Sequence, residues 1–153
     1  ILDLINNVFE QLEMKAKKKN ITLSLDELST SSVYVHADME RIQQVVSNLL
    51  VNSIKYGHNN GTTEVNVESL NKDKVVVRIT DNGEGIEEVH LEKVFDMFYR
   101  ATNSSPGTGL GLYISKEITD KLGGTISIAS SRGVGTEVTI TLPQQAHEQI
   151  PTH

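Results

Sequence analysis

Apolar side chains recur at helical spacing in three parts of the chain. Residues 1–19 carry them at every third or fourth position, which predicts an amphipathic helix. The same spacing predicts helices over 38–56 and 110–122, and Asp38 has the character of an N-cap for the first of these. The segment 87–98 is expected to be only partly helical.

Other segments alternate apolar and polar residues, as strands do. The segments 63–70 and 74–80 flank a turn at 71–73 and predict an antiparallel hairpin. Further strands are expected at 21–25, 33–35, 125–129 and 136–142. Because no strand-helix-strand unit repeats, the order favours an α+β two-layer α/β sandwich, with a mixed, mostly antiparallel sheet packed on helices.

Length and composition indicate one folded domain. The chain has 153 residues, of which 37% are hydrophobic and 22% charged, values typical of a globular domain. We expect this domain to cover 1–142 and a loose tail to cover 143–153. The net charge of -6 argues against a nucleic-acid partner. Without cysteine, thiolate chemistry and disulfides are excluded.

No apolar run approaches the roughly 20 residues of a membrane span, so we expect no membrane contact by this chain and a cytoplasmic location, with a parent protein that is membrane-anchored or soluble. The chain lacks an initiator Met and is expected to be a piece of a longer protein. The basic run 15–19 is interpreted as a solvated helix end without a function.

A polar stripe lies on the helix predicted at 38–56. At about 100° per residue, Asn48, Asn52 and Lys55 fall within roughly 60° of one another, on the side opposite the apolar residues. Such a stripe is compatible with ordinary solvated surface. It is also compatible with a site, because amide oxygens are hard ligands suited to Mg²⁺ and a lysine can meet a phosphate.

Two glycine-bearing loops suggest further contacts. The loop 81–85 follows a strand, and Asp81 could accept a hydrogen bond from the exocyclic amine of adenine, although a simple turn explains the same residues. The loop 107–112 opens a helix, whose unpaired amides suit phosphate. It is neither a P-loop nor a dinucleotide fingerprint, since it lacks Gly-Lys-Ser/Thr and no strand precedes it.

The order of these motifs resembles the histidine kinase branch of the superfamily of gyrase, heat-shock chaperone, histidine kinase and mismatch-repair ATPases. The segment 48–56 resembles the N box, 81–85 the G1 box, 95–100 the F box and 107–112 the G2 box. The resemblance covers about residues 1–142. It implies a Bergerat-type sandwich that binds ATP with Mg²⁺ and acts as a protein-histidine kinase.

By this resemblance, Asn52 is the expected Mg²⁺ ligand, supported by Asn48, and Lys55 and Arg100 are the expected catalytic contacts to phosphate. Tyr56 is expected to pack near the nucleotide and Asp81 to recognise adenine. Met97 stands where many relatives have a basic residue. Phe95 and Phe98 are expected to anchor the lid by packing. The remaining nucleotide contacts implied are Gly83, Gly85, Gly107, Thr108, Gly109, Leu110, Gly111 and Thr136.

Position 48 separates branches of this superfamily. Chaperone, gyrase and anti-sigma kinase relatives resemble this pattern but carry a Glu there, which can activate water or a serine hydroxyl. Asn48 cannot take a proton at neutral pH, whereas a neutral imidazole needs no such base. A histidine acceptor is therefore favoured over hydrolysis of ATP.

None of the five histidines has the setting that the family's acceptors resemble. The acceptor is expected on a dimerisation hairpin upstream of this chain, and a response regulator receiver domain is expected to take the phosphate next. We expect the isolated chain to be a monomer that does not label itself. Two alternatives stay open, a degenerate nucleotide-binding module without phosphotransfer and a true ATP hydrolase. The histidines are His36, His58, His90, His147 and His153.

Overall fold

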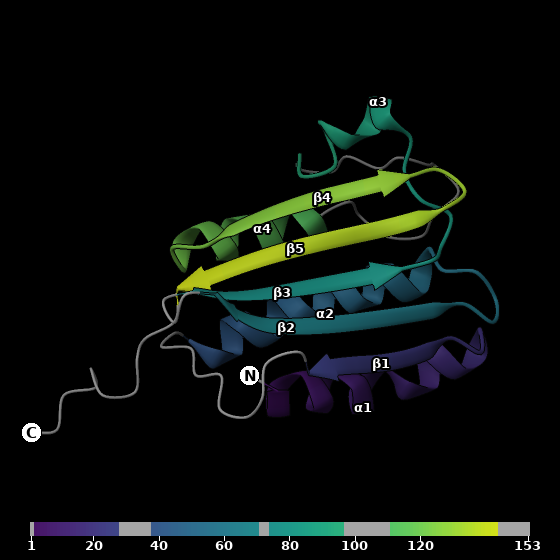
Figure 1. Ribbon diagram of the computed structural model, residues 1–153, viewed down its shortest axis with the longest axis horizontal. Helices are drawn as coiled ribbons and strands as arrows, with labels where there is room; N and C mark the ends of the chain where they lie inside the picture. Colours follow the sequence, from purple (N-terminus) through teal and green to yellow (C-terminus); the bar gives the residue numbers. More distant parts are fainter. Residues whose placement is uncertain (1, 28–37, 71–73, 97–110, 144–153) are drawn as a thin grey trace, which may run out of the picture.

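The computed structural model describes residues 2–27, 38–70, 74–96 and 111–143, and in these residues five strands form one sheet (Figure 1). The spatial order is β1-β2-β3-β5-β4, in which β1 runs parallel to β2 and the other neighbours are antiparallel. The predicted two-layer sandwich with a mixed, mostly antiparallel sheet is confirmed. The strands are β1 Thr22–Glu27, β2 Thr62–Leu70, β3 Lys74–Asp81, β4 Thr125–Ser131 and β5 Gly135–Pro143.

Three helices cover one face of this sheet (Figure 1). They are α1 (Leu2–Lys18), α2 (Met39–Lys55) and α4 (Gly111–Lys121), and α2 lies between the other two. The short helix α3 (Glu88–Leu91) lies beyond the β4 edge. The bounds of α1, α2 and α4 were predicted within a few residues, and α3 covers only the first part of the segment 87–98 that was expected to be partly helical.

The start of α2 follows from its sequence. Asp38 has extended backbone and accepts hydrogen bonds at Oδ1 from the amides of Glu40 (3.0 Å) and Arg41 (3.4 Å). These bonds satisfy two of the amides that every helix leaves without an intrahelical partner. The predicted N-cap is confirmed.

The core lies between the sheet and the helices. Inward-facing residues of β2 and β3 alternate with outward ones, and Val65, Val67, Val77 and Ile79 are at most 2% exposed. Ile5 and Val8 of α1 and Leu50 of α2 are completely buried against the same core, at 0% exposure. Apolar side chains that recur at every second residue of the strands therefore pack against those that recur about every 3.6 residues in the helices, and together they form a single apolar layer.

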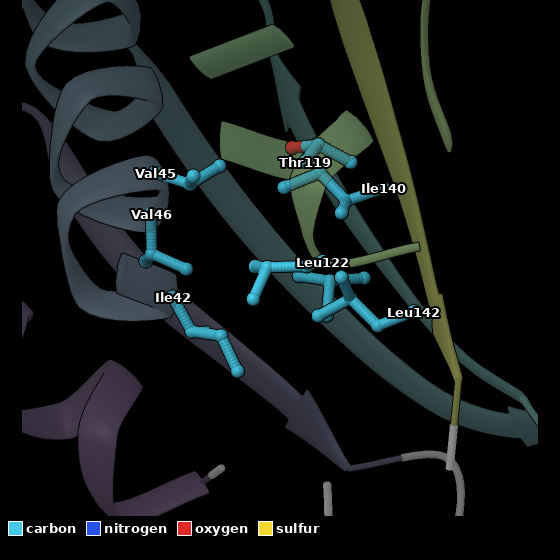
Figure 2. Close-up of a pocket in the computed structure, with 8 residues that line it drawn as sticks. Ile42, Val45, Val46, Thr119, Leu122, Ile140 and Leu142 are labelled. Carbon is cyan, nitrogen blue, oxygen red and sulfur yellow. The ribbon is translucent and has the colours of Figure 1, made fainter. Parts of the chain in front are cut away.

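A gap of ≈ 10 Å³ remains between α2, α4 and the sheet (Figure 2). Ile42, Val45 and Val46 face Leu122 across it, with Thr119, Val77, Ile140 and Leu142 completing the wall. The hydroxyl of Thr119 donates to the Ser115 carbonyl at 2.7 Å, so it is already paired. A void of this size holds one water at most and its lining is apolar. It is a packing gap, and a ligand site must be sought elsewhere.

The end of α1 corrects one prediction. Lys15, Lys17 and Lys18 are exposed, as expected of a solvated helix end, but Lys19 is not part of that face. Its ammonium donates to the carbonyls of Ile54 (3.0 Å), Lys55 (2.6 Å) and Gly57 (3.3 Å). Asn20, which was expected to end the helix, follows directly after Lys19 and has a left-handed φ of 52°.

The predicted strand at 33–35 and the tail beyond Pro143 lie outside the described residues. The domain boundary near residue 142 therefore stays a prediction, although β5 ends at Pro143. Within the described part of the chain, no helix combines the length and apolar character that a membrane span requires.

Candidate functional site

The predicted polar stripe is present on the second half of α2. The outer face of this helix is exposed at Glu40, Arg41 and Gln44, whereas Asn48 and Asn52 are half-buried. Lys55 is half-buried too, and its ammonium lies 5.4 Å from the ring centroid of Tyr56, within cation–π range. The three polar side chains are therefore partly shielded from solvent, unlike those in the first half of the helix.

Asp81 occupies the end of the central strand. It pairs with Thr63 of β2 on one side and with Thr136 of β5 on the other. Its carboxylate accepts from the Gly83 amide at 2.9 Å and from the Ser53 hydroxyl, and the Thr136 amide is near enough to lower its pKa. α2, β2, β3 and β5 thus all contribute to the surroundings of one carboxylate.

Burial governs the ionisation of this carboxylate. Loss of solvation raises the pKa of Asp81 above its ordinary value of 3.8. The hydrogen bonds from Gly83, Ser53 and Thr136, and the charge of His58, lower the pKa but do not cancel the effect of burial. Burial therefore destabilises the ionised form of Asp81, the form that only accepts hydrogen bonds. Such perturbed carboxylates are common where the group has a functional role.

Gly83 brings the end of α2 against this loop. A Cβ at Gly83 would lie 2.6 Å from the Tyr56 carbonyl oxygen and 3.0 Å from Asp81 Oδ1. The next amide, of Glu84, donates to the same Tyr56 carbonyl at 3.1 Å. Any side chain at position 83 would force Asp81 and Tyr56 apart, so the predicted role of Gly83 in shaping the site has a steric basis.

Gly85 has a different explanation. Its φ is 74°, and a Cβ there would lie 2.0 Å from the carbonyl oxygen of Ser131. The glycine is required by the approach of this loop to the end of β4. No ligand is needed to account for it.

Three of the polar residues around Asp81 and α2 were missed by the sequence motifs. Ser53 is 5% exposed and Thr63 is 1% exposed, and their hydroxyl oxygens lie 2.7 Å apart. Lys19, the third, belongs to the basic run that was given no function. A signal existed for Ser53 and Thr63, because each is a hydroxyl on the inward-facing side of an amphipathic element.

Several predicted site residues lie outside the described part of the chain. They are Arg100, Gly107, Thr108, Gly109 and Leu110, together with Met97 and Phe98. Gly111 is described as the first residue of α4. Phe95 is half-buried next to Val94, which is 5% exposed, in keeping with the packing role expected of it.

The side-chain oxygens on α2 suit a Mg²⁺ ion that is also bound by the phosphates of the nucleotide. They do not form a complete metal site of their own. Asn48 and Asn52 offer two amide oxygens one helical turn apart. Among the described residues no group of three or more His, Cys, Asp or Glu could hold a metal. Because Mg²⁺ keeps several waters and binds substrate phosphates, one or two protein oxygens suffice.

Comparison with known families agrees with this geometry. A family model described as histidine kinase-, DNA gyrase B-, and HSP90-like ATPase matches residues 37–146, which include α2 and β2 to β5. The chain belongs to this family, and ATP is the nucleotide that it takes.

The relatives point to the histidine kinase branch. Sensor protein kinase WalK of Staphylococcus saprophyticus is 36% identical over 149 residues, covering 94% of this chain and 24% of the relative. The chain therefore spans about a quarter of that protein's length. The solved catalytic domain of histidine kinase ThkA has a TM-score of 0.83 and 32% identity, covering 94% of this chain and 92% of that one. A mycobacterial sensor histidine kinase, MprB, has a TM-score of 0.79 at 26% identity and 94% coverage of both chains. The fold is that of a histidine kinase catalytic domain.

Proposed function

We propose that this chain binds ATP with Mg²⁺ and donates the γ-phosphate to a histidine on a separate dimerisation hairpin of the same kinase. The observation that carries the proposal is the absence of a base on α2. The single carboxylate of this helix is Glu40, twelve residues before Asn52, or about 18 Å along the helix axis. Position 48, one turn from Asn52, carries an amide. Activation of water or a serine hydroxyl therefore has no base on this helix, whereas a histidine acceptor needs none.

The predicted polar residues have the following roles in this proposal. Asn52, supported by Asn48, places an amide oxygen towards the nucleotide's Mg²⁺, which would neutralise phosphate charge. Lys55 contacts phosphate and Tyr56 packs near the nucleotide. Asp81 accepts from the 6-amino group of adenine, and Thr136 lies beside it. Arg100 and the loop 107–111 are proposed to enclose the phosphates.

The phosphate transfer needs no base from this chain, because the acceptor nitrogen is already unprotonated. The lone pair of a neutral imidazole nitrogen forms the new bond to the γ-phosphorus. The bond from that phosphorus to the bridging oxygen breaks, and ADP leaves with the electron pair. The phosphorylated ring then loses the proton on its other nitrogen to solvent. This chain contributes binding, orientation and charge stabilisation.

Two partners follow from the proposal. One is the hairpin that carries the acceptor histidine, and the other is a response regulator receiver domain that takes the phosphate from it. Support comes from histidine kinase ThkA, which was solved in complex with response regulator protein TrrA and has a TM-score of 0.79 and 29% identity to this chain. The aligned part covers 95% of this chain and 40% of that kinase.

Calorimetric titration with a non-hydrolysable ATP analogue, with and without Mg²⁺, tests the binding part. We expect binding that depends on Mg²⁺ and prefers ATP to the GTP counterpart. Asn52→Ala should remove most of the Mg²⁺ dependence, whereas Asn59→Ala, an exposed amide beyond α2, should leave it unchanged. A folded protein that binds neither nucleotide would make this chain a degenerate module.

Transfer is tested with γ-labelled ATP and the histidine-bearing hairpin of the parent kinase. Label should appear on that hairpin in an acid-labile, alkali-stable form and should be absent when the acceptor histidine is replaced. Steady release of inorganic phosphate by the chain alone, lost in Asn52→Ala, would instead establish an ATP hydrolase.

A further inference from the structure

A buried chain of hydroxyl groups connects α2 to the carboxylate at the end of β3. The hydroxyl oxygens of Ser53 and Thr63 are 2.7 Å apart, and both residues are almost wholly buried. Ser53 also hydrogen-bonds to the carboxylate of Asp81. Thr63 and Asp81 are direct partners across β2 and β3, so their side chains lie on the same face of the sheet. The three side chains form one continuous polar path between α2, β2 and β3.

The direction of each bond in this path follows from proton counting. An ionised carboxylate only accepts, and a serine hydroxyl has one proton. Ser53 must therefore donate to Asp81, and Thr63 must be the donor in the bond between the two hydroxyls. Ser53 has no proton left for any other partner. Its proton is committed to the carboxylate.

The carboxylate of Asp81 keeps acceptor capacity beside its contacts in the protein. A carboxylate has about four lone-pair positions. The Gly83 amide takes one of them at 2.9 Å, and the Ser53 hydroxyl is a second donor. Capacity therefore remains for an N–H of an exocyclic amine.

We infer that Ser53 is a positioning residue for purine selection. By donating to Asp81, it fixes the carboxylate so that an acceptor oxygen faces the 6-amino group of the bound adenine. This inference rests on the proposed function, because it assigns Asp81 to adenine. Ser53 itself touches the carboxylate and acts on the nucleotide through it.

The electrostatics agree with this role. Burial raises the pKa of Asp81, and the bond from Ser53 opposes that rise. A protonated carboxyl would donate where the purine amine also donates. The elements around Asp81 contribute neutral groups, Ser53 from α2, Thr63 from β2 and Thr136 from β5, and the one titratable group facing it among the described residues is His58. Ser53 is therefore a principal donor holding Asp81 in its accepting form.

The test uses two nucleotides that differ only at this amine, ATP and purine riboside triphosphate, which carries hydrogen at position 6. Three proteins are compared by titration: the wild type, Thr63→Val, and the double variant Ser53→Ala/Thr63→Val. Replacing Thr63 together with Ser53 avoids leaving the threonine hydroxyl without an acceptor. Alanine is the best helix former, so α2 is retained, and thermal unfolding verifies the fold.

The wild type should prefer ATP by about tenfold or more, the usual worth of a hydrogen bond to a charged group. Thr63→Val should keep that preference, because Ser53 still donates to Asp81. The double variant should reduce it to about twofold while binding the 6-hydrogen nucleotide as the wild type does. On acidification, the double variant should also lose ATP affinity at a higher pH than the wild type does, because Asp81 has lost a donor that favours its ionised form.

Two results would overturn the inference alone. The double variant could retain the full preference for ATP, or it could lose affinity for both nucleotides by the same factor, as a purely structural defect would. A wild type that binds neither nucleotide would remove the proposed function itself, and this inference with it. Wild-type binding without preference for the 6-amino group would remove the adenine assignment of Asp81.

Discussion

The ammonium of Lys19 lies 2.6 Å from the carbonyl oxygen of Lys55, the last residue of α2. Two more carbonyls, of Ile54 and Gly57, complete its surroundings. A positive charge placed against the last carbonyls of a helix complements the helix dipole and pairs groups that have no intrahelical partner. The junction of α1 and β1 is thereby fastened to the helix that carries the N-box residues.

Lys19→Met should lower the free energy of unfolding by about 1–2 kcal/mol, because three carbonyls lose a charged donor while the apolar stem is kept. Urea unfolding at neutral pH measures the change. The matched control is Lys18→Met, since Lys18 is exposed and belongs to the solvated face of α1; its effect should stay within about 0.5 kcal/mol. Equal effects of both variants would show that the contacts of Lys19 do not stabilise the fold.

Asp81→Asn should weaken ATP binding by about 10- to 100-fold, because an amide N–H then faces the purine amine or the charged acceptor is lost. Fold stability at neutral pH should not fall. The folded pKa of Asp81 is raised, so its contribution to stability is present below the unfolded pKa and is lost as the pH rises through the folded pKa. At neutral pH the carboxylate is a cost, which Asn removes. Unchanged ATP affinity would disprove the assignment of Asp81.

ATP affinity should decrease on acidification through the folded pKa of Asp81, in a range that begins above 3.8. The protonated carboxyl is a donor and no longer matches the amine of adenine. Titration calorimetry at decreasing pH measures this loss.

The control for this pH dependence is His58→Gln. His58 is exposed, and its charge lowers the pKa of Asp81. Removing that charge should move the loss of affinity to a slightly higher pH and leave it otherwise intact. If His58→Gln abolished the pH dependence, Asp81 would not be the group responsible for it.

Gly85→Ala and Gly133→Ala separate backbone strain from steric conflict. Both glycines have left-handed φ, 74° and 83°, but a Cβ at Gly133 meets nothing within 4 Å, whereas one at Gly85 would lie 2.0 Å from the Ser131 carbonyl oxygen. Gly133→Ala should cost about 1–2 kcal/mol from backbone conformation. Gly85→Ala should cost about 1–3 kcal/mol more from the clash. Thermal unfolding of both variants decides; equal losses would mean that the Gly85 loop moves freely away from β4.

The sequence alone predicts the helices and strands of the described residues, and it identifies candidate site residues where they belong to a recognisable motif. Periodicity located α1, α2 and α4, and Asp38 identified the start of α2, because capping and amphipathic spacing are local properties. The Asn48, Asn52 and Lys55 stripe could be derived from one helix alone. Asp81 could be placed after a strand, but the pairing with Thr63 and Thr136 that surrounds it is a long-range property of sheet order.

The contacts of Ser53 and Lys19 were not predicted from the sequence. Ser53 lies on the same side of α2 as Val46 and Leu49, so its hydroxyl interrupts an apolar face and could have been questioned. Lys19 gave no comparable signal, because it ends a run of lysines and its acceptors are carbonyls 35 to 38 residues away in the sequence. Contacts over such a separation cannot be derived from spacing.

The position of β3 at the centre of the sheet also affects how often this part of the molecule opens. β3 is paired with strands on both sides along its whole length, up to Asp81 at its end, so its amides should exchange with solvent more slowly than those of the edge strands. Edge strands and short elements such as α3 open far more often than such a centre does. Under the proposed function, an incoming nucleotide therefore meets an Asp81 carboxylate whose surroundings persist between binding events and do not have to be assembled for each one.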